Sequence, residues 1–140
     1  MMQRVINSVG LDWDVPYSTV HNSMAWKALI RWVKNTHNVE VLLVKLRRSP
    51  YGHVHVVVVF AARSNWSFLR RLELRSMLHD DANRISADLA RHARGEPVER
   101  LWDFKMKGNG QTHRAGPWLM AYSILSGWSD GKTQDEVSGE

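Results

Sequence analysis

The sequence contains no cysteine, which excludes disulfide bonds and thiolate-bound metals. Any metal ion must therefore be held by Asp, Glu or His side chains. The sequence also lacks an apolar run of the roughly 18 residues that a transmembrane helix needs, so no membrane partner is expected. Its N-terminal residues have no long apolar segment and soon include acids, so no signal peptide is predicted and we expect a cytoplasmic protein.

The composition is that of a globular protein. The chain has 140 residues, of which 44% are hydrophobic and 24% charged, enough for one domain with a substantial core. We expect this domain over residues 1–128 and a polar, flexible tail over residues 129–140. A net charge of +5 favours a polyanionic partner. The seven tryptophans suit either the core or stacking on nucleobases.

Hydrophobic periodicity and turn residues predict a mixed α+β chain. The predicted strands cover residues 4–15, 39–46, 53–61, 100–107 and 111–114, and the predicted helices cover residues 20–34, 64–93 in two pieces, and 118–125. The order β-α-β-β-α-β is typical of a ferredoxin-like or RNA-recognition-motif-like sandwich, here with a C-terminal hairpin and short helix.

The strand over residues 53–61 opens with two histidines. Because strand side chains alternate, His53 and His55 share one face with the valines that follow at alternate positions. An ordinary interpretation is one histidine exposed at the turn and one buried in the core. The neighbouring Arg47 and Arg48 favour a functional pair instead. With Lys45 they form a basic run that suits phosphate, although it could also be a solvated turn.

Three aspartates are candidate metal ligands. Asp12 and Asp14 lie two apart on the first strand and share a face, and Asp103 lies in the apolar run of the fourth strand. In the usual fold the first and third strands are neighbours, which would bring Asp12 and Asp14 beside His53 and His55. Asp103 could also be a strand-end acid facing water. Converging carboxylates suit Mg²⁺ or Mn²⁺, and two such ions can activate a hydroxyl and stabilise a leaving phosphate oxygen.

These patterns together resemble the archaeo-eukaryotic primase superfamily, which includes prim-pols and the polymerase domain of bacterial end-joining ligases. The motif of two acids resembles residues 9–14, and the serine- and glycine-containing turn into a histidine strand resembles residues 48–56. The third motif, an acid on a strand, resembles residues 101–104. Residues 107–118 are similar to the glycine turn, threonine and proline-aromatic segment of the end-joining polymerases.

The resemblance implies a primase- or polymerase-like nucleotidyltransferase. Asp12, Asp14 and Asp103 would bind two metal ions, while Ser49 and His55 would contact the triphosphate. Further phosphate-binding candidates are His53, Lys45, Arg47, Arg48 and Arg114. The implied reaction is attack of a 3′-hydroxyl on a nucleoside triphosphate, directed by single-stranded or primed nucleic acid during replication of a plasmid, virus or similar element. A replication partner or a second copy of the chain could be required.

Two alternatives use the same residues differently. The segment His53-Val54-His55 also resembles the HUH endonucleases, in which two histidines bind one metal and a helix tyrosine attacks DNA. Here that tyrosine would be Tyr122, which is otherwise a core or interface aromatic. The third reading is a non-catalytic single-strand binder that stacks bases on exposed sheet aromatics. Its candidates are Trp13, Trp102 and Phe104, but their alternation with the acids predicts that they face the helices.

Charged residues surround the break between the two pieces of the helical segment. They are Arg75, Asp80, Asp81, Arg84 and Asp88. Their spacing predicts ion pairs across a turn between two helices. The other interpretation is a contact with a template or a partner subunit.

Overall fold

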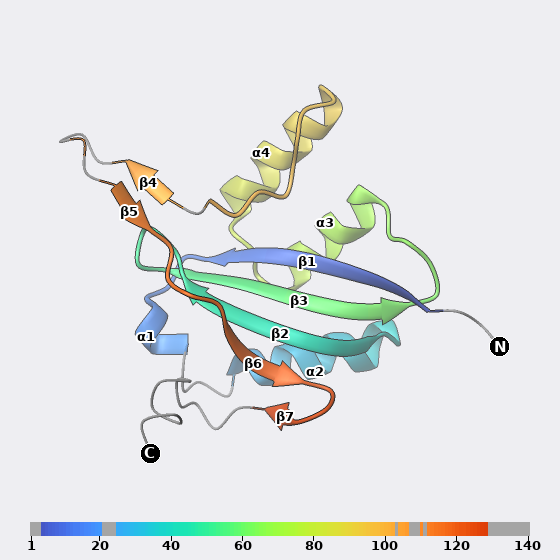
Figure 1. The fold of residues 1–140 in the computed structure, drawn as a ribbon. Helices are drawn as coiled ribbons and strands as arrows, with labels where there is room; N and C mark the ends of the chain where they lie inside the picture. The colour runs from blue at the N-terminus through green and yellow to red at the C-terminus, as the bar shows by residue number, and fades with distance from the viewer. Residues whose placement is uncertain (1–3, 21–24, 103, 107–109, 111, 129–140) are drawn as a thin grey trace, which may run out of the picture.

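A computed structural model describes residues 4–20, 25–102, 104–106, 110 and 112–128. The fold is mixed α+β, as the sequence predicts (Figure 1). The helices are α1 (Tyr17–Val20), α2 (Ala25–His37), α3 (Phe68–Met77) and α4 (Ala82–Ala93). The strands are β1 (Val5–Trp13), β2 (Glu40–Arg48), β3 (Val54–Ala62), β4 (Phe104–Met106), β5 (Thr112–Arg114), β6 (Leu119–Ser123) and β7 (Gly127–Trp128).

The main sheet has five antiparallel strands in the order β1-β3-β2-β6-β7. Its first three strands are compatible with a ferredoxin-like arrangement, in which β3 lies between β1 and β2. The β-branched run of β3 explains this central place, because Val54, Val56 and Val58 are fully buried. The predicted neighbours β1 and β3 are confirmed as hydrogen-bonded partners.

The C-terminal third confirms one expectation and overturns another. Part of the strand predicted over residues 100–107 forms β4, which pairs antiparallel with β5, so the predicted hairpin with residues 111–114 is present, as a two-stranded sheet separate from the main sheet. The segment predicted as a helix over residues 118–125 forms β6, which pairs with the outer edge of β2. The free backbone groups at that edge of β2 provide hydrogen-bond partners for β6. As a strand, β6 also directs its apolar residues into the core.

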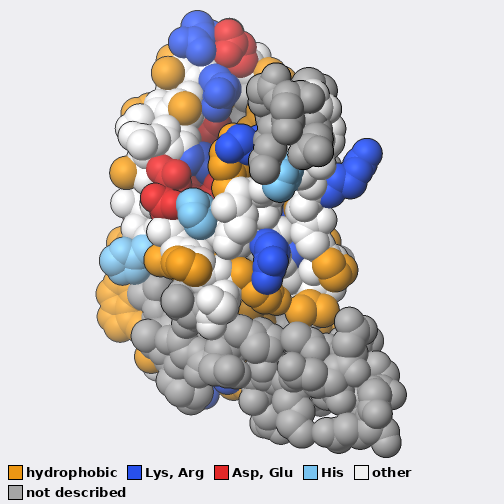
Figure 2. Space-filling model, turned by 90° about the vertical axis from the view of Figure 1, so that its left-hand side faces the viewer, with side chains coloured by type: hydrophobic (Ala, Val, Ile, Leu, Met, Phe, Trp, Pro, Cys, Tyr) orange, Lys and Arg blue, Asp and Glu red, His pale blue; other side chains and the backbone are white. Residues whose placement is uncertain are grey.

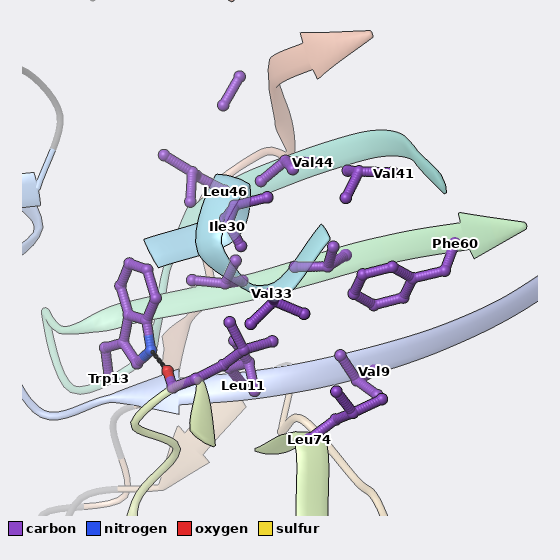
Figure 3. Close-up of a cluster of buried hydrophobic side chains, with 14 of the residues drawn as sticks. Val9, Leu11, Trp13, Ile30, Val33, Val41, Val44, Leu46, Phe60 and Leu74 are labelled. Atoms are coloured by element: carbon purple, nitrogen blue, oxygen red, sulfur yellow. Dashed lines mark hydrogen bonds between the residues drawn. The ribbon is translucent and has the colours of Figure 1, made fainter. Parts of the chain in front are cut away.

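One face of the main sheet carries the hydrophobic core (Figure 3). Val9, Leu11 and Trp13 project from β1 at alternate positions and meet apolar residues of α2 and α3. Each fully buried side chain of this kind contributes about 1.5–3 kcal/mol relative to exposure. In contrast, α4 projects away from the sheet beyond the β1 edge (Figure 1). The opposite face of the sheet is therefore the one that the helices α2 and α3 leave open.

Some expectations fall on parts of the chain that lie outside the described residues. They are Asp103, most of the 107–111 turn, and the tail over residues 129–140. Among the helices of the described ranges, none combines the length and apolarity needed to span a bilayer.

Candidate active site

Asp12, His55 and Arg47 form a row across three strands of the open sheet face. Asp12 on β1 is the register partner of His55 on β3, and His55 is in turn the partner of Arg47 on β2. Directly opposed residues in an antiparallel sheet project to the same face. The row therefore brings an acid, an imidazole and a guanidinium together from segments far apart in the sequence.

The contacts in this row orient the imidazole of His55. Arg47 donates a hydrogen bond from Nε to Nδ1 of His55, at 2.9 Å. An Nδ1 atom that accepts a hydrogen bond in a neutral imidazole leaves the proton on Nε2. That Nε2 lies 3.9 Å from Oδ2 of Asp12. The His55 side chain is only 3% exposed and that of Asp12 is 31% exposed, so Asp12 is the member of the row that solvent reaches.

A second acid–histidine pair stands beside the first. Nδ1 of His53 lies 3.0 Å from Oδ1 of Asp14, and both side chains are well exposed. The structure thus brings Asp12, Asp14, His53 and His55 together at one end of β1 and β3. Figure 2 shows acidic and histidine side chains next to one another, with basic side chains close by.

The turn between α3 and α4 holds the backbone of Asp12. The amide of Asp12 donates to Oδ1 of Asp80 at 2.7 Å, and the amide of Asp81 donates to the carbonyl of Asp12 at 3.1 Å. Nη1 of Arg84 donates to the carbonyl of Gly10 at 2.8 Å. These groups satisfy the outer edge of β1, where the fourth strand of a ferredoxin-like sheet would pair.

A buried ion network supports this turn. Oδ2 of Asp80 accepts from Nε of Arg75 at 2.7 Å and from Nη1 of Arg84 at 2.6 Å. Nη1 of Arg75 lies 2.8 Å from Oδ2 of Asp88, and the Arg75 side chain is 0% exposed. The predicted ion pairs across the helix break are confirmed, with Asp81 also capping α4. The link to Asp12 was not foreseen, because nothing in the local spacing relates the turn to β1.

The electrostatic environment of Asp12 disfavours its charge. Burial raises the pKa of the Asp12 carboxyl, Arg84 opposes this rise, and the carboxylates of Asp80 and Asp81 add to it. Burial likewise lowers the pKa of Arg84, although Asp80 opposes that change. A carboxyl whose pKa is raised by burial and by neighbouring carboxylates is typical of functional sites. A bound cation would favour its ionised form.

The described residues supply part of the predicted metal site. Asp12 and Asp14 offer the oxygen ligands that Mg²⁺ and Mn²⁺ prefer. Among the described residues, no group of three His, Asp or Glu side chains is placed to share one ion. The third predicted ligand, Asp103, lies outside them. His55 is poorly suited as a ligand through Nε2, because that nitrogen carries the proton when Nδ1 accepts from Arg47.

The basic run divides between the two faces of the sheet. Lys45 and Arg47 lie on the open face beside Trp118, with Nζ of Lys45 at 5.5 Å and the guanidinium carbon of Arg47 at 4.4 Å from its ring centroid. Arg48 pairs in register with a core valine and lies over Tyr17 on the other face. The remaining basic candidate, Arg114, is exposed on β5 in the separate small sheet. Period-two alternation alone predicts the separation of Arg47 from Arg48.

Ser49 organises the turn between β2 and β3. Its Oγ accepts hydrogen bonds from the amides of Tyr51 and His53, at 3.2 and 3.1 Å. The residue is 2% exposed. The φ of +82° at Gly52 explains the glycine in this turn. In this conformation Ser49 sets the path of the chain that delivers His53 and His55 to the open face.

The aromatic candidates lie in different environments. Tyr122 is on β6 and not on a helix; it is opposite Val44 on the core face and packs 4.6 Å from Trp128. Tyr122 and the histidine pair therefore lie on opposite faces of the sheet. Trp13 is buried on the helix side, as alternation predicts, and donates to the carbonyl of Leu78. The same prediction is wrong for Trp102, which is 56% exposed because residues 100–102 do not form a strand of the main sheet. The side chain of Phe104 is outside the described set.

A pocket of about 570 Å³ opens beside Asp12. Its walls are α4 and the segment over residues 96–102, and its lining includes Arg84, Arg91, Arg100 and Trp102. Sequence reasoning missed this pocket. The seven-residue spacing of Arg84 and Arg91, which puts both on one face of a helix, was the available signal.

Comparison with known proteins found no matching family model, curated protein or solved structure.

Proposed function

We propose that the protein is a metal-dependent nucleotidyltransferase that acts on a nucleic-acid template. The observation that carries the proposal is the row of Asp12, His55 and Arg47 on the open face of a ferredoxin-like sheet. An acid whose pKa is raised stands at the end of β1, next to a second exposed acid. The primase-like resemblance implies two acids at this place, together with Asp103, which lies outside the described residues.

Within this proposal, Asp12 and Asp14 hold divalent metal, together with Asp103. A bound Mg²⁺ or Mn²⁺ would activate the attacking 3′-hydroxyl and offset the charge that develops on the leaving pyrophosphate. His55 is buried with Nε2 directed at Asp12, so it acts through the position of that carboxylate. Asp80 and Asp81 keep the Asp12 backbone in place through two hydrogen bonds. Such fixed support is what a site needs for reproducible geometry.

The open face also supports binding of a nucleic-acid strand. Lys45 lies beside Trp118 and places a cation next to an aromatic ring, while the buried Arg47 packs against the same ring. The net charge of +5 adds a favourable long-range field for a polyanion. Single-stranded or primed nucleic acid and nucleoside triphosphates are the partners that follow.

Incorporation of labelled nucleotides tests the proposal. The full chain is incubated with primed and unprimed templates, each nucleoside triphosphate mixture, and Mg²⁺ or Mn²⁺. We expect incorporation that stops with EDTA and is lost in Asp12→Asn, but is retained in Glu73→Gln, which removes a surface acid of α3. Absence of incorporation under all these conditions, or full activity of Asp12→Asn, would overturn the proposal.

A second candidate function is binding of single strands without catalysis. Trp118, flanked by Lys45 and Arg47, is the observation that favours it. A pure binding module would show salt-dependent affinity for single strands that survives Asp12→Asn, and no incorporation. Lys45→Ala would then weaken the binding of single strands, whereas substitution of the acids would not.

A further inference from the structure

The pocket beside Asp12 is lined by three arginines and a tryptophan. Arg84 and Arg91 face it from α4, and Arg100 and Trp102 face it from the segment that follows the helix. Its volume of about 570 Å³ lies within the range of small-molecule sites, roughly 300–1,000 Å³. A single nucleotide fits a site of this size.

The pocket has cationic groups available for an anion. Arg100 makes no ion pair with any carboxylate of the described residues. Arg84 lines the pocket and contributes positive charge to it, although its Nη2, which has no hydrogen-bond partner among the described atoms, is itself buried. Arg91 is partly exposed, and its ion pair with Asp88 is a long contact of 3.3 Å. These donors are of the type that bind phosphate oxygens most strongly.

The acids of the pocket wall are already engaged. Asp88 contacts the buried Arg75 and also accepts from the amide of Glu99. Glu96 is paired with Arg94. These carboxylates are therefore compensated by groups within the protein. Asp12 stands at the same pocket and connects it to the proposed metal site.

Trp102 adds a surface for a base. More than half of its side chain is exposed, and the guanidinium carbon of Arg100 lies 5.5 Å from the ring centroid. An exposed indole next to cations is the combination on which nucleobases stack.

We infer that this pocket binds a nucleoside triphosphate, with its base against Trp102 and its phosphates among Arg84, Arg91 and Arg100. The inference rests on the proposed function for the choice of a triphosphate, and it deepens that function by naming where the substrate is held. It differs from the sequence-based assignment, which gave the phosphates to residues 45–55 and Arg114. The substrate then reaches Asp12 from the α4 side.

Calorimetric titration of the full chain tests this inference. The probes are a nucleoside triphosphate and inorganic tripolyphosphate, each in the presence of EDTA so that binding needs no metal. Arg91→Ala and Arg100→Ala should each weaken nucleotide affinity about tenfold, the effect of losing roughly 1.4 kcal/mol. Trp102→Ala should weaken the nucleotide by a similar factor and leave tripolyphosphate unchanged, because only the nucleotide carries a base.

The matched controls are Arg63→Ala and Trp32→Ala, two exposed residues outside the pocket. Both should bind as the wild type does, with unfolding midpoints of all variants measured in parallel. Absence of nucleotide binding by the wild type, or equal losses in the control variants, would overturn the inference.

The two proposals fail in different ways. If nucleotide binding depends on Arg100 but the wild type incorporates no nucleotide, the pocket is supported and the transferase function is overturned. If the wild type incorporates nucleotides and the nucleotide KM is unchanged in Arg91→Ala and Arg100→Ala, the transferase function is supported and the pocket is overturned.

Discussion

The backbone amide of Asp12 donates a 2.7 Å hydrogen bond to the side chain of Asp80, which lies 68 residues further along the chain. The same Asp80 carboxylate accepts from Arg75 and Arg84, so the candidate catalytic acid is attached to a buried network of charges. The network replaces a neighbouring strand along this part of β1. The position of Asp12 consequently depends on the stability of the α3–α4 turn.

Asp12→Asn should separate stability from activity. Folding raises the pKa of this carboxyl, mainly through burial, so the contribution of Asp12 to stability is present at low pH and is lost as pH rises through the folded-state value. Thermal melts at pH 7 should show the variant as stable as the wild type or more so, with the difference closing below pH about 4. Incorporation should fall by about 100-fold or more. A large loss of stability at pH 7 would contradict this account.

Asp80→Asn should destabilise the fold. It leaves the fully buried Arg75 without one of its two carboxylates, and breaking a buried pair costs about 3–5 kcal/mol. Urea denaturation measures the free energy of unfolding. Glu73→Gln, which breaks an exposed pair with Arg70, is the control and should cost less than about 1 kcal/mol. Similar costs for the two variants would show that the network does not support the turn.

The imidazole of His55 should carry its proton on Nε2 at neutral pH. The hydrogen bond from Arg47 to Nδ1 requires it. Long-range ¹H–¹⁵N correlation spectra report the tautomer directly, and Arg47→Met should release it toward a mixture. The exposed His79 provides a reference signal within the same chain. A proton found on Nδ1 of His55 would exclude the contact and the role proposed for the row.

Ser49→Ala should lower the free energy of unfolding by about 1–3 kcal/mol. Its buried Oγ accepts from two turn amides, which would lose their partner. Urea denaturation again provides the measurement, together with the nucleotide KM. A raised KM at unchanged stability would instead support the triphosphate contact that the primase-like resemblance implies.

Tyr122→Phe should leave any reaction with DNA unchanged. Tyr122 packs against Trp128 on the core face, while His53 and His55 lie on the opposite face of the sheet. Incubation with end-labelled single-stranded DNA and metal, followed by denaturing gel electrophoresis, tests for a covalent product. An adduct formed by the wild type and lost in this variant would establish the nickase reading instead.

Local patterns determined most of the first two thirds of the fold. Three features follow from the conformational preferences of neighbouring residues, and each is present in the structure. They are the alternation of buried and exposed side chains in β1, the β-branched run of β3, and the helix break near Asp81, which caps α4. The placement of Asp12 and His55 on one face also followed from period-two alternation and the strand order.

The tertiary structure alone decided the rest. Residues 119–123 form a strand because the free edge of β2 supplies hydrogen-bond partners, which outweigh a local pattern that also fits a helix. The attachment of Asp12 to Asp80, the tautomer of His55 and the arginine pocket all join residues from distant parts of the chain. Sequence separation hides such contacts, since they exist only once the core has brought these segments together. The residue types thus determine which chemical groups the site contains, and folding determines how those groups are arranged.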